Sequence, residues 1–435
     1  MWPYKIAVLG LWHLGEIYSA GLSDLGHQVV GLSEDESLIS NFQKNIPPLP
    51  EPNLEETLKN NQAVGRLTFS ADFSKIEGCD VLWVTFDTPV NNQDEVDLTL
   101  IWSALGKSLP HLKNQSLIII SSQIPVGTSN KICEFINQKR PDLNFDYIYS
   151  PENLRLGEAL ECFKNPGRIV FGAFSSKASE KFKDILSGLK TEFIEMSPVS
   201  AEMSKHAINA FLATSVSFIN DLSDLSEKVG ADIIDVSRAL KSEPRIGPKA
   251  FLSAGIGFAG GTLGRDLQAL IKSAKDQNIS LPVIESIYEK NKNRAEAILN
   301  ILQKNLGDFK NKKISILGLT YKPGTRTLRR SRSLEIALKL KNLGARLSLC
   351  DPQVDEKELA SFGDFDFSRD PYQAVANAEA VIVATPWPEF RDLDFQKLKE
   401  VASSNAIIFD TSNFFSEKES IIKKVGFIYL GIGRK

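Results

Sequence analysis

The chain has 435 residues, of which 51 are basic and 54 acidic, so its formal charge is −3. This length predicts two or three domains with buried cores, and the balanced charge argues against nucleic acid or an anionic membrane surface as a partner. No segment has the length and hydrophobicity of a signal peptide or a membrane span. The cysteines at positions 79, 133, 162 and 350 lack metal-ligand or C-x-x-C spacing. They predict no metal site, no disulfide framework and a reducing cytoplasm.

In chain order, apolar runs of strand length come first and alternate with helical patterns. Continuous β-branched runs suit parallel strands that are buried on both faces; here they read KIAVLG, HQVVGL, VLWVTF, SLIIIS and DYIYS, all within the first 150 residues. From about residue 200 to 300 the strand signal disappears, and one long helical pattern ends in SDLSEKV. A second strand–helix series then follows with KKISILGLT, ARLSLCD, AVIVAT and AIIFD.

This order predicts an α/β protein with two Rossmann-like, doubly wound parallel-sheet domains. A long central helix and a helical middle domain are expected to join them. The expected boundaries are 1–198 for the first Rossmann domain, 199–300 for the helical domain and 301–435 for the second Rossmann-like domain.

The first strand–helix turn reads GLWHLG, from Gly10 to Gly15. A dinucleotide turn has the pattern G-x-G-x-x-G, in which the second glycine lets the backbone approach the pyrophosphate. Here Trp12 stands at that second position. Ser33 and Glu34 follow the next strand, where an acidic residue would hold the ribose 2′-hydroxyl. Taken alone, the turn is equally consistent with a cofactor site and with an ordinary connection.

A glycine-rich stretch, GIGFAGGTLGRD, occupies residues 255–266 and precedes a helical run. So much bare backbone is typical of a loop that passes close to a ligand, although a simple helix-capping turn has the same composition. On the long predicted helix, Lys205 and Asn209 lie four residues apart and therefore share a face.

The whole chain resembles the UDP-glucose/GDP-mannose dehydrogenase family, the nucleotide-sugar 6-dehydrogenases. The similar stretches are EPNLEE, DTPV, SQIPVGT, SPENLRLG, KHAINAFLATSVSFIN, EPRIGP, LGLTYKPGT and the closing GIGR, in that order. The resemblance implies an N-terminal NAD-binding domain, a central helical domain with a dimer-forming helix, and a C-terminal domain that binds a nucleotide sugar.

The resemblance also implies roles for individual residues. Glu152 matches a glutamate used as an acid/base or water-holding group, Lys205 and Asn209 match groups that stabilise an oxyanion and position the sugar, and Asp266 matches the aspartate that works with the lysine. Thr262 stands where the family has a nucleophilic cysteine. The implied substrate-binding residues are Glu152, Leu154, Arg155, Lys205, Asn209, Arg245, Gly255 and Lys322. The implied cofactor-binding residues are Gly10, Trp12, His13, Leu14, Gly15, Ser33, Glu34, Thr88, Gln123 and Arg329.

Several positions depart from the family pattern, and most of them belong to the cofactor or the nucleophile. They are Trp12, Ser33, Gln123, Leu156, Thr262, Thr327 and Ser412. A threonine hydroxyl needs an adjacent base before it acts as a nucleophile, whereas a thiol is partly ionised near neutral pH. We therefore expect the covalent route to the acid to be impaired.

The expected function is an NAD-dependent oxidoreductase that acts on a CH–OH group of a nucleotide sugar, most simply a UDP-sugar, in polysaccharide biosynthesis. It either stops after one two-electron oxidation or reaches the acid through a hydrated aldehyde activated by Lys205 and Asp266. Two alternatives stay open, a non-catalytic nucleotide-sugar binder and an epimerase that retains NAD. NADP stays open beside NAD because of Ser33, and a cytoplasmic homodimer is expected.

Overall fold

The computed structural model describes residues 3–89, 96–152 and 154–434. Val90 of DTPV and Asn153 of SPENLRLG lie outside these ranges. The chain divides into two compact units, residues 1–207 and 208–435, which are described separately. The domain boundaries expected at residues 198 and 300 stay a prediction. No helix in the described ranges is long and apolar enough to cross a membrane.

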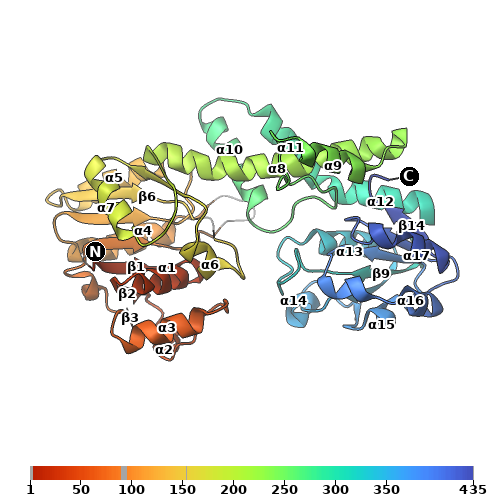
Figure 1. The fold of residues 1–435 in the computed structure, drawn as a ribbon, viewed down its shortest axis with the longest axis horizontal. Helices are drawn as coiled ribbons and strands as arrows, with labels where there is room; N and C mark the ends of the chain where they lie inside the picture. Colours follow the sequence, from red (N-terminus) through yellow and green to blue (C-terminus); the bar gives the residue numbers. More distant parts are fainter. Residues whose placement is uncertain (1–2, 90–95, 153, 435) are drawn as a thin grey trace. The chain divides into compact units, whose positions relative to one another are not determined.

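The N-terminal unit is built around an eight-stranded sheet in the order β3-β2-β1-β4-β5-β6-β7-β8 (Figure 1). Its strands are β1 (Lys5–Leu9), β2 (Gln28–Leu32), β3 (Leu67–Ser70), β4 (Val81–Val84), β5 (Ser116–Ile120), β6 (Phe145–Tyr149), β7 (Ile169–Ala173) and β8 (Phe193–Met196). Its helices are α1 (His13–Asp24), α2 (Glu36–Gln43), α3 (Leu54–Ala63), α4 (Thr99–Ser108), α5 (Thr128–Lys139), α6 (Ala159–Lys164) and α7 (Ser176–Ile185), with 3-10 turns η1 (Phe73–Ile76) and η2 (Leu109–His111).

The first six strands of this order are parallel. The apolar runs predicted five of them, and β3 is an additional strand. The last two strands do not run parallel to these, because β7 pairs antiparallel with β6, and Tyr149 lies opposite Gly172. β8 then runs parallel to β7. The chain therefore returns to the carboxyl end of β6 when it enters β7, and the segment between these strands lies at the edge where α/β folds bind ligands.

Strand β1 shows why the sheet is buried on both faces. Ile6 and Val8 belong to one apolar core cluster, whereas Ala7 and Leu9 belong to another. Since successive side chains point to opposite faces of a strand, helices must cover both sides.

The long central helix is α8 (Pro198–Val229), with 32 residues. Pro198 stands at its first position, where the missing N–H costs no helical hydrogen bond. Four helices follow it in the C-terminal unit: α9 (Ile233–Ser242), α10 (Leu263–Asp276), α11 (Pro282–Lys292) and α12 (Arg294–Leu306).

The C-terminal unit contains a six-stranded parallel sheet in the order β11-β10-β9-β12-β13-β14. Its strands are β9 (Lys313–Leu317), β10 (Arg346–Cys350), β11 (Asp366–Phe367), β12 (Ala380–Val383), β13 (Ile407–Asp410) and β14 (Ile428–Gly431). Its helices are α13 (Arg332–Asn342), α14 (Glu356–Ala360), α15 (Pro371–Val375), α16 (Phe395–Val401) and α17 (Glu419–Lys424), with turns η3 (Pro388–Asp392) and η4 (Ser416–Lys418). The expected fold class, two doubly wound α/β sheets with a helical middle, is confirmed.

Candidate active site

The first βα turn keeps the backbone shape that a dinucleotide needs. Gly10 has φ +91°, and a Cβ atom there would lie 2.9 Å from Phe86. A Cβ atom on Gly15 would lie 2.1 Å from the carbonyl oxygen of Gly10, so helix α1 packs too closely for any side chain at that position. Helix α1 receives no capping hydrogen bond from the side chain of its N-cap residue, Trp12. Its first N–H groups and helix dipole therefore suit a pyrophosphate.

Trp12 does not fill this turn, because its side chain is 48% exposed. Leu14 is buried in the core below, so only its backbone faces the turn. The backbone of this turn therefore fits NAD. Trp12 stands at the position where a glycine would let the backbone come closest to the pyrophosphate.

The end of β2 holds its acidic residue in an ion pair. Glu34 contacts Lys107 of α4, and both side chains are largely exposed. The hydroxyl of Ser33 accepts a hydrogen bond from the backbone N–H of Asp35 at 3.2 Å. A ribose at this point would meet a serine hydroxyl and a carboxylate that is already paired.

Thr88 and Gln123 come together although 35 residues separate them. The Thr88 hydroxyl donates to the backbone oxygen of Gln123 at 2.9 Å, and both residues are buried. They follow β4 and β5, which are neighbours in the sheet.

Lys205 and Glu152 also meet in the N-terminal unit. The Lys205 ammonium donates to the backbone oxygen of Glu152 at 2.5 Å, and its Nζ lies 3.5 Å from Glu152 Oε1. The other carboxylate oxygen accepts from the Leu154 N–H at 2.7 Å. Two predicted catalytic side chains are thus in direct contact, with the lysine largely buried.

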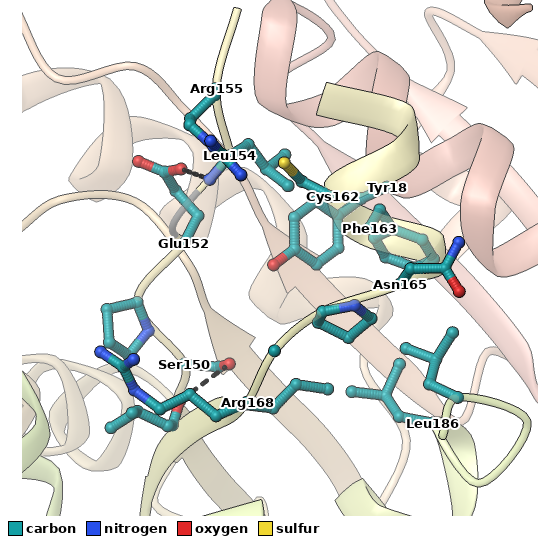
Figure 2. Close-up of a pocket in the computed structure, with 16 residues that line it drawn as sticks. Tyr18, Ser150, Glu152, Leu154, Arg155, Cys162, Phe163, Asn165, Arg168 and Leu186 are labelled. Carbon is teal, nitrogen blue, oxygen red and sulfur yellow. Dashed lines mark hydrogen bonds between the residues drawn. The ribbon is translucent and has the colours of Figure 1, made fainter. Parts of the chain in front are cut away.

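A cavity of about 160 Å³ lies beside this pair. Figure 2 shows Glu152, Leu154 and Arg155 near one another on its wall. Arg155 is exposed and pairs with Glu158 at 3.4 Å. Tyr18, Cys162 and Phe163 line the cavity as well (Figure 2).

In the C-terminal unit, Asn209 donates a hydrogen bond to Asp266. Asp266 is fully buried in the first turn of α10, and Asn209 is also buried. Thr262 is the N-cap residue of the same helix, but its side chain makes no capping bond. It is exposed, and its hydroxyl has no hydrogen-bond partner in the described part of the chain. Within the described residues of the C-terminal unit, no general base therefore activates it.

Side chains from three helices hold the glycine-rich loop, and the sequence pattern did not reveal them. Asn220 of α8 accepts from Gly255 N–H at 2.9 Å. Asn291 of α11 accepts from Phe258 N–H at 2.9 Å and donates to Phe258 O at 3.0 Å. Arg294 of α12 donates to Gly255 O at 2.8 Å. Asn291 and Arg294 lie in the polar run EKNKNRAE, so the sequence pattern gave no signal that would have singled out these two residues.

Gly257 fits this frame only as glycine. Its φ is +91°, and a Cβ atom there would lie 2.3 Å from Asn291 Oδ1. Gly255 has space, since a Cβ atom there would first meet Thr411 O at 3.4 Å. Gly260 also has a positive φ of +76°, and a Cβ atom there would lie 3.0 Å from the Tyr321 ring. The loop conformation thus depends on these two glycines and on the buried polar partners.

Three predicted residues of the C-terminal unit are exposed. Arg245 pairs with Glu243 at 2.7 Å, and the Lys322 ammonium lies 5.8 Å from the centroid of the Tyr321 ring. Arg329 donates only its backbone N–H, to Thr327 at 3.1 Å. Among the described residues, no group of three or more His, Cys, Asp or Glu side chains is arranged to hold a metal ion.

Three family models match the chain in sequence order. Residues 4–190 match the NAD binding domain of the UDP-glucose/GDP-mannose dehydrogenase family, residues 199–293 its central domain, and residues 315–417 its UDP binding domain.

Characterised proteins resemble the chain over its whole length. A UDP-glucose 6-dehydrogenase of Rhizobium meliloti is 34% identical over 441 residues, with 99% of each chain covered. UDP-glucose 6-dehydrogenase TuaD of Bacillus subtilis is 35% identical, covering 99% of this chain and 93% of its own. A solved UDP-glucose dehydrogenase from Pyrobaculum islandicum has a TM-score of 0.89 at 28% identity and covers 100% of this chain and 98% of its own.

Proposed function

The chain belongs to the UDP-glucose/GDP-mannose dehydrogenase family, and from that premise we propose that it oxidises a sugar alcohol of a UDP-sugar. The first βα turn, Gly10–Gly15, would hold NAD, which would supply the hydride acceptor. The contact between Lys205 and Glu152 carries this proposal, because hydride removal from an alcohol also needs a group that takes the hydroxyl proton. Fold resemblance alone does not supply that group.

Several of the predicted catalytic and substrate-binding side chains described above, though not Thr262, have a task in this reaction. Glu152 accepts the hydroxyl proton directly or through a water molecule, and the Lys205 ammonium stabilises the alkoxide as it forms. Asn209 holds the sugar through its amide, and Asp266 fixes the orientation of that amide by accepting its hydrogen bond. Arg245 and Lys322, both exposed cations, bind the diphosphate.

The first oxidation needs no nucleophile from the protein. The alcohol loses a hydride and a proton and becomes an aldehyde, and these residues suffice for that step. The second oxidation normally begins with covalent capture of the aldehyde, and Thr262 lacks a base that would activate it. We propose that the wild-type protein stops at the aldehyde, or continues slowly through the hydrated aldehyde with Lys205 and Asp266 activating the water.

The test is reduction of NAD by candidate UDP- and GDP-sugars, with NADP in parallel reactions. NADH formation with a UDP-sugar is the expected result. Binding of the sugar nucleotide by thermal shift without any NADH would instead support a non-catalytic binder. NAD that stays bound through purification and cycles without net reduction would support an epimerase.

We also propose that the protein is a homodimer through α8. Large apolar side chains on this helix recur every seven residues and remain exposed: Phe211 by 71%, Phe218 by 47% and Leu225 by 56%. A spacing of seven places them along one side of the helix, which suits pairing with the same stripe of a second copy. A monomeric mass by light scattering at micromolar concentration would contradict this assembly.

The cytoplasm is the compartment that we propose. All four cysteines are free thiols, and free thiols persist in a reducing compartment.

A further inference from the structure

Glu51 is a buried carboxylate that holds the end of the loop after β6. Its side chain is 0% exposed. One oxygen, Oε1, accepts from the N–H of Gly157 at 2.7 Å, and the other, Oε2, accepts from the N–H of Ala159 at 3.0 Å. Gly157 has φ +88°, so the chain turns sharply there before α6 begins. Charge-assisted bonds of this kind fix the backbone that follows Glu152, Leu154 and Arg155.

The same oxygen also contacts the cofactor turn. His13 Nε2 lies 2.9 Å from Glu51 Oε1, and His13 is the first residue of α1. Three segments far apart in sequence therefore meet at one carboxylate: the dinucleotide turn, the EPNLEE segment and the loop after β6. Because His13 and Gly157 share one acceptor atom, a change in the histidine rotamer changes the bond that holds the loop.

A second carboxyl group lies near this junction. Glu16, one residue beyond the turn on α1, is fully buried. Burial raises the pKa of Glu16 to about 9, the Leu49 backbone partly opposes the shift, and the carboxylates of Glu51 and Asp87 add to it. Glu16 is therefore neutral near pH 7. Glu16 therefore adds no negative charge beside Glu51.

We propose that His13 and Glu51 are positioning residues that couple the cofactor turn to the loop of Glu152, so that NAD bound at Gly10–Gly15 orders residues 154–159. This rests on the proposed placement of NAD at that turn. A dinucleotide on the N-terminus of α1 restricts the residues of its first turn, including His13. A histidine held in one rotamer keeps its bond to Glu51, and the conformational entropy of the loop is then lower before the sugar binds.

The experiment is hydrogen–deuterium exchange of the full chain, with and without saturating NAD, read on peptides that cover residues 154–163. In the wild type, NAD is expected to slow exchange at Gly157 and Ala159 about five- to tenfold, within the usual range of coupling between sites. His13→Leu, which cannot donate to Glu51, should lose this slowing. His13→Gln, whose amide can donate, should restore part of it, which a purely structural role of the histidine does not predict.

His111→Leu is the matched control, because His111 also pairs with a glutamate, Glu77, at 3.0 Å but lies on the surface. It should keep the wild-type response. NAD affinity is measured by calorimetry on the same samples. Wild-type protein that binds NAD without slowing the loop would overturn this proposal alone, and so would a His13→Leu variant that binds NAD and keeps the full slowing.

Two further outcomes are decisive. If His13→Leu no longer binds NAD, the exchange experiment is repeated with Glu51→Gln. The glutamine amide offers only one oxygen to the N–H groups of Gly157 and Ala159, where the carboxylate offers two. NAD-dependent slowing that persists in Glu51→Gln would overturn the coupling, and its loss would support it. Failure of the wild type to bind NAD at all would overturn the cofactor placement and this proposal with it.

Discussion

Replacing Thr262 with cysteine is expected to add a fast second oxidation to the reaction. The thiolate attacks the aldehyde carbon, the resulting adduct passes a hydride to a second NAD, and water releases the acid and the thiol. Threonine cannot start this sequence, because its hydroxyl has no base within hydrogen-bond reach in the described residues. The substitution exchanges a hydroxyl and a methyl group for one thiol at an exposed position, so little strain is expected.

The position of residue 262 determines how much thiolate the introduced cysteine carries. A free cysteine has a pKa of about 8.5. Residue 262 caps the N-terminus of α10, a helix of 14 residues, and such a terminus stabilises an anion by about 0.3–1 kcal/mol. That corresponds to a pKa lower by about 0.2–0.7 units, since one unit is about 1.36 kcal/mol. At pH 8 the thiolate fraction then rises from about a quarter to between about a third and three fifths.

The assay counts NADH per sugar nucleotide, with the sugar limiting, and identifies the product by mass. Wild type and Thr262→Ser, the matched hydroxyl control, should release at most one NADH rapidly. Thr262→Cys should approach two, and its second phase should accelerate as the pH rises through about 8. Two rapid NADH per sugar in the wild type, with uronic acid accumulating, would refute the reasoning about Thr262.

Three further substitutions test the structure. Gly257→Ala should lower the free energy of unfolding by about 2–5 kcal/mol, because the alanine would have to adopt a left-handed backbone and would disrupt the Asn291 hydrogen bonds. Urea unfolding measures this loss. Gly261→Ala is the control and should show no comparable loss, because a Cβ atom at Gly261 would meet nothing within 4 Å. Phe218→Lys should convert the proposed dimer to monomer in light scattering, and a dimer mass that stays unchanged would contradict the α8 interface. The folded state retains the Glu16 proton up to about pH 9, whereas the unfolded chain loses it at about pH 4.3. The free energy of unfolding therefore falls as the pH rises between these two values. Glu16→Gln should therefore raise Tm more at pH 8.5 than at pH 5.5, and equal gains at both would count against the buried acid.

The features that the sequence predicted are those that depend on the local pattern of residues. Apolar runs identified the central parallel strands of both sheets but not β3, β8, β11 and β14. The four-residue spacing of Lys205 and Asn209 placed both side chains on one helical face. The reversal at β7 was not predicted, because strand direction depends on pairing partners and not on the residues of the strand itself. Glu51 was missed for the same reason. Its ligands at positions 157 and 159 lie about a hundred residues away, and nothing in EPNLEE indicates which amides it binds.

The frame around the glycine-rich loop has a consequence for how this protein can change. Asn220, Asn291 and Arg294 belong to helices outside the loop, and they hold its backbone without using residue 262. The side chain at position 262 can therefore change without altering the hydrogen bonds that hold the loop backbone. A panel of Cys, Ser, Asp and His at this one position would sample different reactions on the same bound sugar while the fold stays constant.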